Sequence, residues 1–213
     1  DHPERGLVLP DQFIPLAEQT SLITEIDDYV WMEVCRQAAV WARDYPDKAD
    51  RFVSVNVSGR ELRHANLAAR LNTAIEHAAL EPHRLVVELT ETFLVSDDKA
   101  ATRTLDDVRA LGVRIALDDF GAGYSSLDYL RRLPIDIIKL DRAFTNELPG
   151  ERACLLVAAV GQLAKDLGAS SEAEGIETFE QLQILRAAGW QLGQGYYFAR
   201  PQSADATAAF LRT

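Results

Sequence analysis

The chain has 213 residues, of which 47% are hydrophobic and 26% are charged, and its formal net charge is −11. This length and composition are typical of one globular domain with a sizeable core, and no linker or low-complexity tract divides the chain. The acidic excess argues against bare electrostatic binding to nucleic acid or to anionic membranes, so no nucleic acid polymer is expected as a partner.

Several features of the chain bear on its location. It contains no apolar stretch of about 18 residues, the length that a transmembrane helix requires. The first residues, Asp1-His2-Pro3-Glu4-Arg5, are too polar for a secretory signal. Cys35 and Cys154 are isolated in helix-like segments, as is typical of buried thiols in a reduced compartment. We therefore expect a cytoplasmic domain, and a longer protein could be membrane-anchored through upstream segments.

Short runs rich in β-branched and aliphatic residues alternate with longer amphipathic runs. The predicted strands are Phe52–Asn56, Leu85–Leu89, Arg114–Asp118, Asp136–Leu140, Ser170–Glu174 and Gln191–Tyr196. The predicted helices are Ile26–Asp44, Leu67–Leu80, Asp98–Leu111, Leu127–Leu133, Arg152–Leu167, Phe179–Ala188 and Ala204–Leu211. Strands that alternate with helices indicate an α/β fold with a mostly parallel sheet.

Six strands permit either an open doubly wound sheet or a (β/α)₈ barrel from which something is missing. Each predicted strand places a polar residue near its carboxyl end, on the face opposite its apolar stripe. An open sheet gathers ligands at one switch point, whereas a TIM barrel collects functional groups from many strand ends. The pattern therefore favours the barrel.

The adjacent carboxylates Asp118 and Asp119 end the third predicted strand and precede a glycine-containing turn. They could cap a helix, or they could hold divalent cations. Oxygen ligands without thiols or imidazoles select Mg²⁺, Mn²⁺ or Ca²⁺. The four histidines show no metal-ligand spacing, so zinc is not expected. The residues that meet this description are Asn56, Glu88, Asp118, Asp119 and Glu174.

Such a group can hold two cations, a recurrent device for cleaving phosphodiesters. Lys139 lies at the same level and could orient or deprotonate the attacking water, or serve only as an ion-pair partner. Plainer roles remain open for the others: Asn56 and Gln194 could be structural hydrogen-bonding residues, and Glu177 with Thr178 could cap the following helix.

The motifs at these positions resemble those of the EAL domain, and they span nearly the whole chain in the family's order. They are Asn56-Val57-Ser58, Glu88-Leu89-Thr90-Glu91, the stretch DDFGAGYSSL at 118–127, Ile138-Lys139-Leu140-Asp141, the stretch AEGIET at 173–178, and Gln194-Gly195-Tyr196. The resemblance implies a TIM-like barrel, dependence on Mg²⁺ or Mn²⁺, and hydrolysis of cyclic di-GMP to linear pGpG in bacterial second-messenger signalling.

The resemblance also assigns roles to single residues. Asn56, Glu88, Asp118, Asp119 and Glu174 would be metal ligands for two ions. Lys139, Glu174 and Asp119 would be catalytic, with Lys139 helping to activate water. Gln194, Glu177 and Asp141 would lie at the substrate. Gly121, Gly123, Tyr124 and Ser125 resemble the loop that couples dimerisation to metal and substrate binding, so a homodimer is implied.

Two departures from the family pattern stand out. The Glu-Ala-Leu signature is absent, and residues 1–7 resemble the stretch just after it. We therefore expect residues 1–213 to be an N-terminally incomplete EAL domain that lacks the first two strands and one metal-binding glutamate, with doubtful activity alone. An upstream sensory or GGDEF domain is compatible with this. The second departure is Ser170-Ser171-Glu172, which is polar where the family strand is usually aliphatic and which points Glu172 inward.

The alternative to a phosphodiesterase is a catalytically inactive receptor for cyclic di-GMP, or a signalling module that binds no nucleotide. The enzyme is favoured because a receptor has no evident need for Asn56, both aspartates and Lys139 together.

Overall fold

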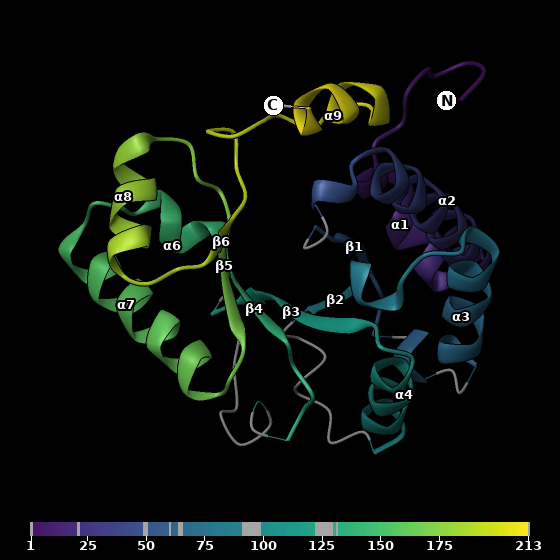
Figure 1. Ribbon diagram of the computed structural model, residues 1–213, viewed down its shortest axis with the longest axis horizontal. Helices are drawn as coiled ribbons and strands as arrows, with labels where there is room; N and C mark the ends of the chain where they lie inside the picture. The colour runs from purple at the N-terminus through teal and green to yellow at the C-terminus, as the bar shows by residue number, and fades with distance from the viewer. Residues whose placement is uncertain are drawn as a thin grey trace.

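The computed structural model describes residues 2–20, 22–48, 51–59, 61–63, 66–90, 99–121, 130 and 132–212. Six strands form one parallel sheet in the order in which they occur along the chain. They are β1 (Val53–Asn56), β2 (Leu85–Thr90), β3 (Arg114–Phe120), β4 (Ile137–Leu140), β5 (Ser170–Ala173) and β6 (Leu192–Gly193). The sheet curves into a half-barrel whose two ends are β1 and β6 (Figure 1). The predicted parallel α/β architecture is therefore confirmed.

The described helices surround this sheet. They are α1 (Pro10–Gln19), α2 (Leu22–Asp44), α3 (Leu67–Ala78), α4 (Lys99–Ala110), α6 (Arg142–Asn146), α7 (Glu151–Asp166), α8 (Phe179–Ala187) and α9 (Ala204–Leu211). Helices α1 to α4 lie toward one end of the sheet, α6 to α8 lie toward the other, and α9 lies between the two groups (Figure 1). In the described part of the chain, every helix is too short or too polar to cross a bilayer.

The two faces of the sheet have different environments because successive side chains point to opposite sides. Outward-facing residues such as Val87, Ile115 and Ile138 are buried against the helices in the main core. Inward-facing residues Val86 and Ala116, with Ile137, form a separate small apolar cluster inside the curve. This cluster forms an apolar floor inside the curve, and the polar residues lie above it, nearer the carboxyl ends of the strands.

Several element bounds differ from the prediction. Helix α1 was missed because Pro10 and Pro15 obscure its pattern, although Pro10 stands at the start of the helix, where a missing N–H is harmless. The short helix α6 was also missed. Strand β6 is much shorter than Gln191–Tyr196, because beyond Gly193 the chain leaves β5: the carbonyl of Gln194 accepts from the amide of Ile176, and the amide of Tyr197 donates to the carbonyl of Ile176. The predicted helix Leu127–Leu133 lies largely outside the described residues.

The two cysteines are both free thiols. Cys35 is fully buried in the main core, and burial raises the pKa of its thiol to about 11. Cys154 is only half-buried, so the prediction of two buried thiols is wrong for that residue. Its Sγ lies 3.6 Å from the carbonyl oxygen of Pro149.

A buried ionic cluster joins α2 to α3. Glu61 is fully buried, forms an ion pair with Arg70, and accepts a hydrogen bond of 2.8 Å from the hydroxyl of Thr24. Arg70 also donates to Asp28, over 2.7 Å. Asp27 lies beside this cluster, and burial, followed by the nearby charge of Glu61, raises the pKa of its carboxyl to about 7.

The raised pKa of Asp27 predicts a pH-dependent stability. The pKa of an unfolded aspartate is about 3.9, so between about pH 4 and pH 7 the folded chain binds more protons than the unfolded chain. The contribution is therefore most favourable at low pH and is lost as the pH rises to about 7. We expect Asp27→Asn to reduce the difference in unfolding free energy between pH 5 and pH 8 by about 1–2 kcal/mol. Urea unfolding at the two pH values measures this, and Asp106→Asn, at an exposed position of α4, is the control. An unaltered pH dependence of the unfolding free energy in Asp27→Asn would contradict the prediction.

Candidate metal centre

Charged side chains gather on the concave side of the sheet, above its apolar floor. Glu88 comes from β2, Asp118 and Asp119 from β3, Lys139 from β4, and Glu174 from the residue that follows β5. The strands are parallel, so these positions lie at the same carboxyl edge of the half-barrel. The sequence prediction of a shared face and level is confirmed for Glu88, Asp118, Lys139 and Glu174, whose charged groups contact one another.

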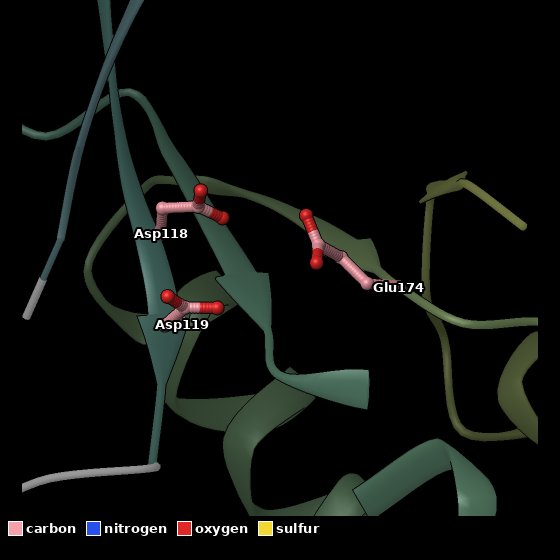
Figure 2. A group of neighbouring side chains, drawn as sticks. All are labelled: Asp118, Asp119 and Glu174. Atoms are coloured by element: carbon pink, nitrogen blue, oxygen red, sulfur yellow. The ribbon is translucent and has the colours of Figure 1, made fainter. Parts of the chain in front are cut away.

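A β-bulge explains how two consecutive aspartates reach the same site. In a regular strand their side chains would point to opposite faces. The pairing of β3 with β4 shifts between Leu117 and Phe120, and Asp119 adopts a left-handed backbone conformation with φ of 55°. As a result, both carboxylates point toward Glu174 (Figure 2). A non-glycine residue in this conformation is strained, and such strain often occurs at functional sites.

Lys139 contacts three of the carboxylates in this cluster. Its Nζ atom lies 2.9 Å from Oε1 of Glu88, 2.9 Å from Oδ1 of Asp118 and 2.6 Å from Oε1 of Glu174. The contact with Asp118 has the geometry of an ion pair rather than of an aligned hydrogen bond. The lysine is only 3% exposed, so its charge is stabilised by these carboxylates and hardly by water.

The pKa values reflect this crowding of charges. Burial lowers the pKa of Lys139, but Glu88, Glu174 and Asp118 outweigh burial, and the pKa lies above its usual range. Burial raises the pKa of Asp119, and the neighbouring Asp118 raises it further. Burial also raises the pKa of Glu174, against the opposing effect of Lys139. In this arrangement Lys139 is an ammonium group that can donate hydrogen bonds but cannot accept a proton.

Three of the carboxylates are placed to share a cation. One oxygen from each of Asp118, Asp119 and Glu174 can be chosen so that all three lie within 4.8 Å of one another. A trio of hard oxygen donors fits Mg²⁺, Mn²⁺ or Ca²⁺. Lys139 already contacts two of the three carboxylates, so a cation bound here would share these ligands with the ammonium group.

The other two predicted ligands, Glu88 and Asn56, lie at the edge of the carboxylate trio. Glu88 is buried and contacts Lys139 rather than the trio. Asn56 ends β1 beside Glu88 in the register of the sheet, and its side chain is exposed. Their roles as ligands therefore stay predictions.

The predicted substrate-contacting residues lie on the segments that follow β4, β5 and β6. Asp141 caps α6 by accepting a 2.7 Å hydrogen bond from the amide of Ala143. Gln194 is exposed, and its carbonyl accepts a 3.0 Å bond from the amide of Ile176. Glu177 is exposed at the start of α8. The backbone thus places Gln194 next to the loop that carries Glu174 and Glu177.

The capping alternative is confirmed for Thr178, which forms a reciprocal capping box with Gln181 at the start of α8. Of the four residues assigned to the coupling loop, Gly121 directly follows β3 and is exposed. Gly123, Tyr124 and Ser125 lie outside the described residues.

Glu172 is the unexpected carboxylate inside the curve. It stands opposite Lys139 in the register of β4 and β5 and is half-buried. Burial raises the pKa of its carboxyl to about 7, although the charge of Lys139 works in the opposite direction. A carboxyl group that is protonated near neutral pH avoids part of the cost of burying a charge, which explains how this strand tolerates it.

Comparison with known proteins places this geometry in context. The EAL domain model matches residues 1–201 of the chain. The chain is 40% identical over 206 residues to the bifunctional diguanylate cyclase/cyclic di-GMP phosphodiesterase MucR of Pseudomonas aeruginosa, covering 96% of this chain and 30% of MucR. It is 39% identical over 212 residues to the cyclic di-GMP phosphodiesterase NbdA of the same organism, covering 99% of this chain and 27% of NbdA. The chain thus spans less than a third of either relative.

Solved structures agree with this. The MucR phosphodiesterase in complex with c-di-GMP superimposes with a TM-score of 0.89 at 40% identity, covering 97% of this chain and 83% of that chain. The EAL enzyme Bd1971, in a form with cAMP and cyclic di-GMP bound, gives a TM-score of 0.91 at 29% identity, covering 99% of this chain and 57% of that chain. The matched motifs, the half-barrel and these relatives lead to one conclusion: the chain belongs to the EAL domain family.

Proposed function

We propose that residues 1–213 are the greater part of a phosphodiesterase that hydrolyses cyclic di-GMP to linear pGpG with Mg²⁺ or Mn²⁺. The observation that carries this proposal is the trio of carboxylates Asp118, Asp119 and Glu174 around Lys139, in a chain closely related to proteins named as cyclic di-GMP phosphodiesterases. EAL phosphodiesterases depend on divalent metals, and oxygen-only ligands suit that requirement.

We assign a role to each residue of the site from its position. Asp118, Asp119 and Glu174 would hold the cations, two in number, with Glu88 and Asn56 completing their coordination. Bound divalent cations supply positive charge to the phosphodiester and help to generate the nucleophile. Lys139 would donate hydrogen bonds, orienting the attacking water and offsetting negative charge. Gln194, Glu177 and Asp141 would contact the nucleotide from the surrounding loops.

The metal site can be tested with the 213-residue chain itself. We expect calorimetry to show binding of Mg²⁺ or Mn²⁺, and Asp118→Asn to weaken it by about tenfold or more, because one charged ligand is lost. Asp166→Asn, an exposed position at the end of α7, is the matched control and should bind like the unmodified chain. Equal affinity in Asp118→Asn and in the control would remove Asp118 from the metal site.

The alternative of a silent receptor calls for a second measurement. Here the extended domain means residues 1–213 preceded by the two barrel strands that the family resemblance adds. A phosphodiesterase requires divalent metal for turnover, whereas a receptor would bind cyclic di-GMP and leave it intact. Nucleotide binding by the extended domain without product, in the presence of Mg²⁺ and of Mn²⁺, would replace the proposed enzyme by the receptor.

The homodimer implied by the family is also a proposal. The pairing region would be the segment around 121–133, which lies mostly outside the described residues, together with the segment that follows Asp141. Light scattering should show a dimer at tens of micromolar concentration, and a monomer with an intact fold would contradict it. A cytoplasmic location, with regulation by an upstream sensory or GGDEF domain, completes the proposal.

A further inference from the structure

A cavity lies at the opposite end of the strands from the carboxylate cluster. It has a volume of about 140 Å³ and lies between the end of α2, the start of β1 and helix α9. Trp41, Phe52 and Leu211 are among the residues that form its apolar walls, with Arg51 and Arg84 also part of the lining. Because β1 begins here and ends at Asn56, the strand separates this cavity from the metal centre.

Helix α9 contributes Thr207 and Leu211 to the lining of the cavity, and hydrogen bonds join this end of the chain to Tyr45, the residue that follows α2. The hydroxyl of Tyr45 donates to the carbonyl of Ala208 over 3.0 Å, and Nε of Arg212 donates to the same hydroxyl over 3.1 Å. A molecule in the cavity would therefore touch α2, β1 and α9 at once.

The nitrogen groups of the side chains that line the cavity are hydrogen-bond donors, and its charged side chains are positive. The indole nitrogen of Trp41 is buried and has no acceptor among the described residues. Nε of Arg84 donates a hydrogen bond to Glu81, so the terminal nitrogens of Arg84 remain available to a ligand. Arg51 has no carboxylate partner in the described part of the chain. A third guanidinium, that of Arg114, lies 4.3 Å from the centre of the Phe52 ring. This concentration of arginines contrasts with a net charge of −11 for the whole chain.

We propose that this cavity is a binding site for a small carboxylate with an apolar ring. A cavity of about 150 Å³ with apolar walls is known to hold a benzene ring, so the volume suits one six-membered ring. The buried indole nitrogen of Trp41 favours a ligand that brings an acceptor, and the guanidinium groups favour a negative charge. The ring would lie near Trp41 and Phe52, and the carboxylate would face Arg51 and Arg84. The proposal is independent of the phosphodiesterase activity.

Benzoate is the probe, because it joins one ring to one carboxylate. We expect the 213-residue chain to bind it with a dissociation constant on the order of 1 mM, as small ligands of this size do. Amide chemical shifts in the NMR spectrum should change in 38–53 and 204–212 and stay constant near Asp118. Benzyl alcohol, which keeps the ring and loses the charge, should bind about tenfold more weakly.

Two variants locate the site. Ala42→Leu adds bulk to a lining residue and should abolish binding, while Arg51→Ala should weaken benzoate about tenfold and leave benzyl alcohol unchanged. Arg36→Ala removes an exposed arginine elsewhere on α2 and should bind like the unmodified chain. Absence of saturable binding by the folded chain would overturn the proposal, and so would equal affinity for benzoate in Ala42→Leu. Equal binding of the charged and neutral probes would overturn the assignment to a carboxylate.

Discussion

Replacing Lys139 by alanine in the extended domain is expected to lower the turnover of cyclic di-GMP by about 100-fold or more, the usual contribution of a positioned hydrogen-bond donor that stabilises charge in the transition state. The loss should fall on kcat rather than on nucleotide affinity, because a group that orients water acts in the transition state. Binding of divalent cations should become tighter in the same variant, because Asp118 and Glu174 no longer share their charge with an ammonium group. Steady-state kinetics and calorimetry measure the two effects separately.

The control for this prediction is Lys165→Ala, which removes an exposed lysine of the same charge from the end of α7. Its turnover and metal affinity should equal those of the unmodified domain. If kcat and nucleotide affinity decreased in parallel in Lys139→Ala, the lysine would be a binding residue. Weaker metal binding in that variant would show that Lys139 supports the site instead of competing with the cations.

Replacing Gly195 by alanine is expected to destabilise the fold by about 3 kcal/mol or more, because the added methyl group meets backbone atoms that cannot rotate away. A Cβ atom at this position would lie 2.1 Å from the carbonyl oxygen of Ile176 and 2.3 Å from its nitrogen. This close approach is what allows Ile176 to bond to Gln194 and to Tyr197, over 3.0 Å and 2.9 Å. The variant should therefore also displace Gln194 from the edge of the site.

Gly189→Ala is the control that separates the cost of steric crowding from the cost of a left-handed backbone conformation. Gly189 has φ of 89°, yet an added Cβ would meet no atom within 4 Å. We expect this control to lose only about 1 kcal/mol, the cost of a left-handed conformation for alanine. Urea unfolding of the 213-residue chain measures both variants, and equal losses would contradict the steric argument at Gly195.

The parts of the fold that depend on alternation could be predicted from the sequence. Strands β2 and β4 are buried on both faces, but successive side chains still point to opposite sides, and this places Glu88 and Lys139 together on the concave face, where they form an ion pair. The separation of an apolar outward face from a polar inward face follows from the same period of two. The clustering of carboxylates at one edge then follows from parallel strands alone.

The remaining features depend on contacts distant in sequence. No periodic pattern predicts the bulge that turns Asp119 toward Glu174, since it arises from the shifted pairing of two strands. The partnership of Glu61 with Arg70 likewise joins a short turn to a helix and has no local signal. Strand β6 ends early because Gly195 lets the chain approach residue 176, a close contact that strand propensity does not describe.

The central claim is tested most directly by chromatography of cyclic di-GMP incubated with the extended domain. With Mg²⁺ or Mn²⁺ present, we predict that linear pGpG accumulates, and that it does not accumulate when a chelator is added or when Asp118→Asn is introduced. Failure of the unmodified extended domain to form pGpG with either metal would contradict the proposed function. Undiminished pGpG formation in the chelated sample or in the variant would show that the carboxylate trio is not the catalytic metal centre.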